Sequence, residues 1–305
     1  MTKKVLVCGG AGYIGSHMVR LLTALDHPVT VFDNLSTGHR EAVPASAELV
    51  EGDIRDSSQL DPLLSGHQFD CVMHFCAASL VGESVADPYK YYDNNVSGSL
   101  SLLQAMRRHG VEQIVFSSTA ATYGIPRSDT IDEGHPTAPI NPYGNSKLAG
   151  ERGAQAAFAD APGLWIVRTS WLYGPPGGDF PDKIVAAADR CDPATALPVV
   201  ADEYGAPTYS RDLAAAVLRL VDVSDGGVFH VVGGGHTSRF GWAERVLAQR
   251  RPGRELRAIS ASEFERASVP PRWGVLDTSR AAALLDGGLP PWQAALDRYL
   301  QAGRS

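Results

Sequence analysis

The stretch VLVCGGAGYIG, residues 5–15, decides the fold. It starts with a continuous apolar run, from which we expect a buried strand over residues 4–7. Gly9, Gly12 and Gly15 follow at a spacing of three, and residues 13–25 then repeat apolar side chains at helical intervals. Glycines between a strand and a helix let a pyrophosphate approach the backbone, where the helix N-terminus adds positive charge. The stretch therefore predicts a dinucleotide site, with Tyr13 and Ile14 beside the glycines.

A second strand, expected over residues 29–32, leads into Asp33, eighteen residues after Gly15. A carboxylate at this point accepts hydrogen bonds from both ribose hydroxyls and repels a 2′-phosphate, so we expect NAD as the cofactor. The neighbouring Asn34 belongs to the same expected site, and tolerance of NADP stays open. After a third strand over residues 48–50, Asp53 and Ile54 are expected near the adenine.

Strands and helices continue to alternate along the chain. We expect further strands at residues 71–75, 113–117 and 164–168, and helices at residues 57–64, 91–109 and 142–158. This rhythm predicts an α/β fold, in which a doubly wound parallel sheet is built with right-handed crossovers.

The pattern changes after Ser170, where a loop rich in glycine and proline occupies residues 174–178. Beyond it we expect helices at residues 181–190, 211–221, 240–249 and 292–300, and a strand at residues 227–232. We therefore expect two domains. Residues 1–170 bind the cofactor and carry the catalytic residues, and residues 171–305 form a smaller substrate-binding lobe over the carboxyl edge of the sheet.

The composition excludes several classes of protein. With 305 residues, 44% hydrophobic and 20% charged, the chain is neither disordered, collagen-like nor a coiled coil. A net charge of −7 argues against a nucleic-acid partner. The four cysteines show no metal-ligand spacing, so we expect free thiols and no metal. Because no apolar run approaches about 20 residues and the N-terminal run is short, we expect no membrane span and a cytoplasmic location.

A candidate catalytic group follows from the helix expected at residues 142–158. Tyr143 and Lys147 are four residues apart, so both side chains lie on one helical face. A nearby ammonium favours the phenolate, which lets a tyrosine act as a base near neutral pH. Thr119 or Ser118, at the end of a strand, can hydrogen-bond the same substrate oxygen. Together they predict acid–base chemistry at an alcohol or ketone beside a nicotinamide.

Six segments carry a resemblance to a known family: GGAGYIGSH (9–17), VFDNLSTG (31–38), GDIRD (52–56), HFCAASLVGESVADPYKYYDNNVSG (74–98), VFSSTAATYG (115–124) and NPYGNSKLAGE (141–151). Residues 5–152 resemble the extended short-chain dehydrogenase/reductases, and more narrowly the UDP-glucose 4-epimerases. The resemblance implies a Rossmann-type fold. It implies Tyr143 as the base, Lys147 as its partner and Thr119 as the third member. Asp33 would hold the adenosine ribose.

Further site residues are expected along the same segments. Phe75, Ala77 and Ser117 are expected at the cofactor, and the resemblance puts Ser84 and Asn95 near the active-site wall. The family's 4,6-dehydratases carry an Asp-Glu pair directly after the position of Thr119. Here that position is followed by two alanines, which argues against dehydration.

The second half resembles a different relative. RTSWLYG (168–174), GDF (178–180), GAPTY (205–209), DLA (212–214), SRFG (238–241) and VLDTS (275–279) are similar to dTDP-4-dehydrorhamnose reductase over residues 165–300. The resemblance puts Trp171 against the sugar. We also expect Tyr209 at the substrate, and Arg239 can bind a diphosphate bidentately. The chain is therefore interpreted as a natural mosaic or an engineered chimera.

Three hypotheses about function stay open. The preferred one is NAD-dependent 4-epimerisation of a nucleotide-diphosphate sugar, with a UDP- or dTDP-hexose as substrate. The alternatives are reduction of a dTDP-4-keto-6-deoxyhexose and a catalytically silent, NAD-binding scaffold. The resemblance also suggests a homodimer formed through the helices at residues 91–109 and 142–158.

Overall fold

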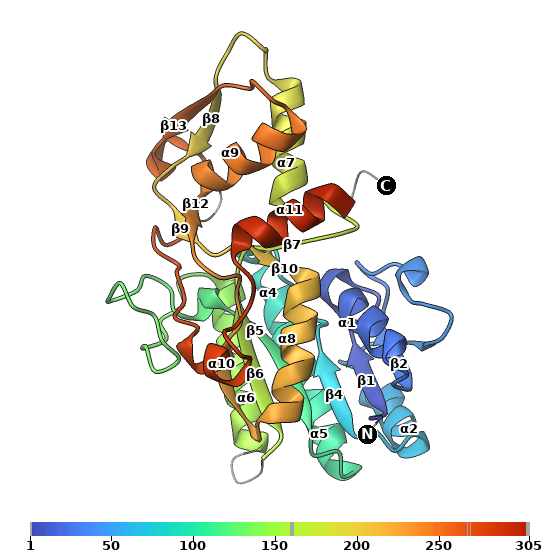
Figure 1. The fold of residues 1–305 in the computed structure, drawn as a ribbon. Helices are drawn as coiled ribbons and strands as arrows, with labels where there is room; N and C mark the ends of the chain where they lie inside the picture. The colour runs from blue at the N-terminus through green and yellow to red at the C-terminus, as the bar shows by residue number, and fades with distance from the viewer. Residues whose placement is uncertain (1, 159–161, 267, 269, 303–305) are drawn as a thin grey trace.

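The computed structural model describes residues 2–158, 162–266, 268 and 270–302. At its centre is a seven-stranded sheet in the order β11-β6-β5-β4-β1-β2-β3, and every neighbouring pair is parallel (Figure 1). The strands are β1 (Val5–Cys8), β2 (Val29–Asp33), β3 (Glu48–Glu51), β4 (Cys71–His74), β5 (Ile114–Thr119), β6 (Leu164–Thr169) and β11 (Gly226–His230). The expected doubly wound, Rossmann-type α/β fold is confirmed.

The first strand shows why the sheet is buried on both faces. Val5 and Val7 point into one apolar cluster, whereas Leu6 and Cys8 point into the other. The strand order reverses between β1 and β4, because the chain builds outward from β1 in both directions. In sheets of this kind a ligand binds at the carboxyl ends of the strands at such a reversal.

Helices cover both faces of the sheet. On one face α1 (Tyr13–Ala24) packs against α8 (Ser210–Val223), with Leu22 and Leu220 both fully buried. On the other face lie α2 (Ser57–Gly66), α5 (Ser99–Arg108) and α6 (Pro142–Ala157). The two helices that contribute the expected site, α1 and α6, therefore lie on opposite faces.

The helix expected at residues 91–109 differs from a single α-helix. The structure has α4 (Pro88–Tyr92), a π-helical turn η2 (Asp93–Gly98) and then α5. Asp87 caps the start by accepting the N–H of Lys90, and Pro88 occupies the first turn. Inside the π-helical turn, the Asn95 side chain bonds both the N–H and the carbonyl of Ala78. The π-helical turn is thus hydrogen-bonded, through Asn95, to the loop that follows β4.

The remaining elements lie outside the central sheet. Besides α3 (Val81–Ala86), there are the 3₁₀ turns η1 (Arg40–Ala42), η3 (Ala120–Thr122) and η4 (Ala261–Glu263). Beyond residue 170 the strands are β7 (Leu172–Tyr173), β8 (Leu197–Val200), β9 (Tyr204–Gly205), β10 (Thr208–Tyr209), β12 (Thr237–Ser238) and β13 (Leu256–Ile259). The helices of this part are α7 (Phe180–Arg190), α9 (Arg239–Arg250), α10 (Ser279–Leu284) and α11 (Trp292–Ala302).

A second core lies away from the sheet. Figure 1 shows α7, α9, β8 and β13 grouped together at the top, with α11 between them and the sheet. Trp242, Leu247 and Leu296 are buried in this core. Not all of the chain beyond residue 170 lies there, because α8 and β11 return to the central sheet. The division at residue 170 stays a proposal.

None of the helices in the described parts of the chain is long and apolar enough to cross a membrane.

Candidate active site

The glycine turn between β1 and α1 is packed too tightly for side chains. Gly9 has a φ of +80°, and a Cβ there would lie 2.6 Å from the backbone nitrogen of Cys76. A Cβ on Gly15 would lie 2.1 Å from the carbonyl oxygen of Gly9. Gly12 provides the N-cap of α1. The turn therefore exposes backbone and helix N-terminus to a ligand at the strand-order reversal.

Asp33 ends β2 beside this turn and is 7% exposed. Its Oδ2 accepts a hydrogen bond of 2.9 Å from the N–H of Ala11, and its Oδ1 accepts one of 2.8 Å from Leu35. A carboxylate offers about four acceptor positions, so both oxygens retain a free lone pair. Asp33 can therefore hold the turn and accept two ribose hydroxyls at once.

The structure separates the other residues expected near the adenine. Asn34 donates a hydrogen bond of 2.9 Å to Asp53. The pKa of Asp53 lies well below its usual range because Arg55 hydrogen-bonds its carboxylate. Ile54, in contrast, is 4% exposed and packs in the core against Gly98. Asn34 and Asp53 thus share one edge of the site, whereas Ile54 supports it from inside.

Three expected cofactor residues lie on the edge formed by the ends of β4 and β5. Phe75 and Ala77 follow β4, Ser117 belongs to β5, and all three are half-buried. The N–H of Phe75 donates to the carbonyl of Cys8 at 2.8 Å. This bond fixes the chain after β4 directly against the glycine turn.

Helix α6 carries the candidate base. It begins at Pro142, after Asn141 caps it by accepting the N–H of Gly144 at 2.8 Å. Tyr143 is half-buried, and burial raises the pKa of its phenol, while a hydrogen bond with the Thr119 side chain acts in the opposite direction. Thr119 ends β5 and is 9% exposed. The side chains of Tyr143 and Thr119 therefore lie close together.

Lys147 lies one helical turn further along α6 and is 2% exposed. Its Nζ lies 5.0 Å from the ring centroid of Phe116. Burial lowers the pKa of the ammonium to about 8, and the charges of Cys76 and Glu151 oppose this shift. Within the described ranges this ammonium has no hydrogen bond or salt bridge. Its three donors thus remain free for a phenolate and a ribose.

Two of the expected substrate residues meet in the structure. The guanidinium of Arg239 lies 3.6 Å from the ring centroid of Trp171, which in turn stacks on Trp242 at 5.6 Å. Burial lowers the pKa of Arg239 to about 9, and no acidic partner is found for it in the described part of the chain. A desolvated cation without a counter-charge is a suitable ligand for an anion.

The other two expected substrate residues have different surroundings. Ser84 is fully buried in α3, and its hydroxyl donates to the carbonyl of Val81 at 2.7 Å. Tyr209 is 4% exposed and stacks on Tyr173 at 5.5 Å inside the second core. Neither side chain forms a hydrogen bond with Tyr143 among the described residues. The stacking of Tyr209 on Tyr173 joins distant segments of the chain, which local sequence patterns do not reveal.

Tyr13 has a contact that the sequence did not indicate. Its hydroxyl donates to the carbonyl of Gly174 at 3.0 Å and to Asp179 at 3.3 Å. Nearby on α1, His17 is hydrogen-bonded to the carbonyl of Pro175 at 2.8 Å. Helix α1 therefore connects the cofactor turn to the loop that leads into α7.

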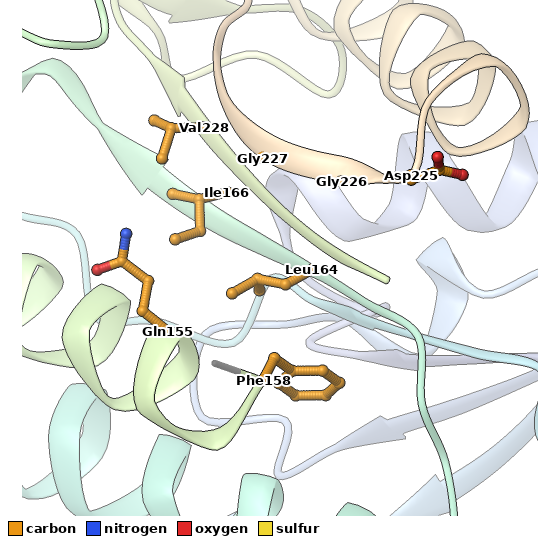
Figure 2. A pocket seen from close by; sticks show the side chains of 8 residues that line it. All are labelled: Gln155, Phe158, Leu164, Ile166, Asp225, Gly226, Gly227 and Val228. Atoms are coloured by element: carbon orange, nitrogen blue, oxygen red, sulfur yellow. The ribbon is translucent and has the colours of Figure 1, made fainter. Parts of the chain in front are cut away.

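A pocket of about 300 Å³ lies elsewhere (Figure 2). Its walls come from α6, β6 and β11: Gln155, Phe158, Leu164, Ile166, Asp225, Gly226, Gly227 and Val228. Leu164 and Gly226 begin their strands, so this pocket is at the amino edge of the sheet, opposite Thr119. It is thus separate from the candidate site. The described residues include no group of three or more His, Cys, Asp or Glu that could hold a metal.

Comparison with curated proteins finds UDP-glucose 4-epimerases. The chain is 55% identical to the enzyme of Lactobacillus helveticus over 149 residues, which is 49% of this chain and 45% of that protein. It is 46% identical to the enzyme of Rhizobium leguminosarum bv. trifolii over 185 residues, 59% of this chain and 54% of that protein. The chain spans about half the length of the curated relatives it matches.

Solved structures of two kinds are similar over nearly the whole chain. A dTDP-4-dehydrorhamnose reductase from Bacillus anthracis, in complex with NADP, has a TM-score of 0.84 at 26% identity. The match covers 99% of this chain and 100% of the reductase chain. A UDP-glucose 4-epimerase from Brucella ovis, in complex with NAD, has a TM-score of 0.80 at 32% identity. The match covers 98% of this chain and 97% of the epimerase chain.

One family matches most of the chain, over residues 5–232. The match includes the glycine turn, Asp33 and the helix with Tyr143 and Lys147. The family is described as NAD dependent, which confirms the expectation of a nicotinamide dinucleotide as cofactor. The chain belongs to the NAD dependent epimerase/dehydratase family.

Proposed function

We propose that the protein is an NAD-dependent 4-epimerase of a nucleotide-diphosphate sugar, with UDP-glucose and UDP-galactose as its substrate pair. The observation that carries the proposal is the proximity of Tyr143 and Thr119 at the end of β5, with the buried Lys147, which forms no salt bridge among the described residues, one turn further along α6. The similarity to the UDP-glucose 4-epimerases of Lactobacillus helveticus and Rhizobium leguminosarum supports the choice of reaction and of sugar.

Each residue has a defined part in this chemistry. Tyr143 takes the proton of the sugar's 4-hydroxyl and later returns it, while Thr119 hydrogen-bonds the same oxygen. The positive charge of Lys147 would favour the phenolate, and its ammonium can also bind the nicotinamide ribose. NAD, which the glycine turn and Asp33 would hold, would supply a reversible hydride acceptor for C4 of the sugar. Because net redox is zero, tightly held NAD suffices.

The residues at the turn fit that cofactor. Glycines 9 and 15 leave no room for a Cβ, so the backbone is open to a pyrophosphate at the N-terminus of α1. Asp33 has free acceptor positions for the ribose hydroxyls and a negative charge that disfavours a 2′-phosphate. Both of these features of Asp33 favour NAD over NADP.

Arg239 and Trp171 are proposed to hold the substrate. An arginine that stacks on an indole and has no acidic partner among the described residues is suited to the diphosphate, and the indole presents an apolar face to the sugar. Ser84 and Tyr209 are buried in other contacts, so we propose that they support the site rather than touch the sugar.

Reduction of a dTDP-4-keto-6-deoxyhexose is the second candidate. The structural similarity to the Bacillus anthracis reductase favours this candidate, because the match extends over the whole of the reductase chain. The same three residues would then protonate the 4-oxygen in one direction only, with a reduced cofactor consumed each time. The mosaic origin of the chain stays a proposal that both similarities support. We also propose a cytoplasmic homodimer.

The experiment uses the purified chain without added cofactor. Bound NAD is measured after denaturation, and UDP-galactose is then supplied alone. Conversion to UDP-glucose supports the epimerase. Absence of conversion, together with oxidation of NADH or NADPH by a dTDP-4-keto-6-deoxyhexose, supports the reductase instead. If neither reaction occurs while NAD is bound, the scaffold hypothesis holds. The Tyr143→Phe variant should lose either activity and still bind cofactor.

A further inference from the structure

Glu151 lies at the same face of α6 as the candidate catalytic pair. It follows Tyr143 by eight residues and Lys147 by four, and it is 1% exposed. Its carboxylate accepts two hydrogen bonds from Arg168, 2.9 Å from Nε and 2.6 Å from Nη2, which together form a bidentate pair. The hydroxyl of Ser118 donates a short third bond to it.

The contacts of Glu151 connect three elements of the site. Ser118 directly precedes Thr119 on β5, whereas Tyr143 is on α6 and Arg168 on β6. The bond from Ser118 to Glu151 therefore sets the position of the end of β5 against α6. That position decides how Thr119 and the phenol of Tyr143 face each other.

Beyond Arg168 the polar contacts continue to the edge of the sheet. Nη1 of Arg168 donates to the hydroxyl of Tyr123 at 2.6 Å, and this hydroxyl is 2.5 Å from Nε2 of His230 on β11. The other ring nitrogen of His230 is 2.8 Å from the carbonyl of Asp277. A buried network with its groups satisfied in this way holds its members in one geometry.

We propose that Glu151 is a positioning residue, which holds β5 against α6 through Ser118 and supports the positive charge of Lys147. This inference rests on the catalytic roles proposed above for Tyr143 and Lys147. Glu151 does not touch the reacting atoms in this assignment. It acts through Ser118, which directly precedes Thr119, and through Lys147.

The charges around Lys147 explain the second part of the proposal. Cys76 faces it from the loop after β4, with His74 beside that thiol, and Tyr143 lies on the same helix. Glu151 and Cys76 are the groups whose charges raise the pKa of Lys147, against the larger effect of burial. Arg168 neutralises part of the carboxylate's charge. Loss of the Glu151 charge should therefore let Lys147 lose its proton at a lower pH.

The test compares two variants that separate position from charge. Glu151→Gln removes the charge with almost no change of shape, and it should shift the alkaline limb of the kcat profile to lower pH by about half a unit or more. Ser118→Ala removes the link to β5 and leaves the charge, so kcat should fall about tenfold with the alkaline limb unmoved. Glu112→Gln, at an exposed glutamate, is the control.

A second measurement does not depend on turnover. The rate at which acetic anhydride labels Lys147 in the cofactor-free protein, followed by peptide mass spectrometry over pH, reports the protonation of its amine. Its midpoint should fall in Glu151→Gln and stay unchanged in Ser118→Ala. If Glu151→Gln does not fold, Glu151→Asp retains the charge and should lower kcat with little change of the midpoint.

The outcomes are distinguishable. An unmoved alkaline limb and an unmoved labelling midpoint in Glu151→Gln overturn the role of its charge. An unchanged kcat in Ser118→Ala overturns the role in positioning. If the unmodified protein converts neither sugar nucleotide, the proposed function fails, whereas the labelling midpoint still decides whether Glu151 supports the charge of Lys147.

Discussion

The carboxylate of Asp33 accepts a hydrogen bond of 2.9 Å from the backbone N–H of Ala11, so the end of β2 holds the glycine turn in place. Asp33 thus has two roles, because it holds the backbone of the proposed pyrophosphate site and also offers hydrogen-bond acceptors to the ribose. Its removal should therefore affect cofactor affinity more than the loss of one ribose contact would.

The Asp33→Asn variant should lose NADH affinity by about tenfold to a hundredfold, because charge-assisted hydrogen bonds contribute roughly 1.5–3 kcal/mol. NADPH should be affected less, since the repulsion of its 2′-phosphate is removed. Fluorescence titration with both cofactors checks this. Asp70→Asn is a matched control, because Asp70 also accepts a backbone N–H, that of Lys4, at the opposite edge of the sheet. Equal losses for both cofactors would contradict the role of Asp33 in selectivity.

Lys147 should show a conflict between stability and activity. Its ammonium is buried and forms no salt bridge among the described residues, and the charges of Cys76 and Glu151 offset the effect of burial only in part, so burying this charge costs free energy. The Lys147→Met variant should be inactive and yet more stable at pH 7, by about 1–3 kcal/mol or several degrees in Tm. Calorimetry beside an activity assay checks both parts. A lower Tm in the variant would show that the ammonium stabilises the fold.

The difference in stability between Lys147→Met and the unmodified protein should change with pH in one direction. In the folded protein Lys147 has a pKa of about 8, below its ordinary value of 10.5. Between these values the unfolded chain binds more protons than the folded one, so the group favours folding increasingly as pH rises. The stability advantage of Lys147→Met should therefore shrink from pH 8 to pH 10. A constant difference across this range would contradict the lowered pKa.

The sequence predicts those parts of the site that depend on local spacing. The glycine turn, Asp33 and the pair Tyr143 and Lys147 each follow from a few neighbouring residues, and the structure puts them at one sheet edge. Ile54 is expected at the cofactor, and its side chain packs in the core, whereas its neighbour Asp53 pairs with Arg55 at the surface. Such pairing cannot be deduced from a three-residue turn.

Contacts between distant segments account for what the sequence did not reveal. Arg239 stacks on Trp171 only because α9 begins next to the end of β6, nearly seventy residues away along the chain. Glu151 could have been noticed from its spacing on α6, but its partner Arg168 is on another strand. Strand β11 joins the sheet after an excursion through the second core, which composition alone does not show.

The proposed homodimer makes a prediction about an exposed apolar surface. Leu80, Val85, Tyr89 and Leu100 lie on or beside α3, α4 and α5, with exposures of 39–85%. Leu100 also contacts α6, since a Cβ on Gly153 would lie 2.8 Å from it. Leu100→Glu should weaken the dimer by about tenfold or more. Light scattering at several concentrations checks this, with the exposed Leu25→Glu as control. A monomer in the unmodified protein would rule out the dimer.

His17 should make the fold sensitive to acid. Burial lowers its pKa in the folded protein to about 4, whereas the ordinary value is 6.5. The unfolded chain therefore takes up this proton first, and the stability present above pH 6.5 is lost as pH falls towards 4. Between pH 7 and pH 5 the loss from this group is about 2 kcal/mol. His17→Gln, which can still donate to the carbonyl of Pro175, should lack that part of the loss. Denaturation curves at pH 7 and pH 5 check this. If the free energy of unfolding falls by the same amount in both proteins, the prediction is contradicted.

Arg239 gives the most direct test of the proposed substrate site. Its guanidinium is stacked between aromatic rings, 3.6 Å from Trp171 and 5.2 Å from Phe180, without an acidic partner among the described residues. Arg239→Met preserves most of the packing volume and removes the charge, so UDP affinity should fall by about tenfold to a hundredfold, with NAD binding unchanged. Isothermal titration calorimetry with UDP measures this. Arg245→Met is the matched control on the same helix, because Arg245 is paired with Asp297 at the surface. Similar losses in both variants would show that net charge, rather than a contact with the diphosphate, governs binding.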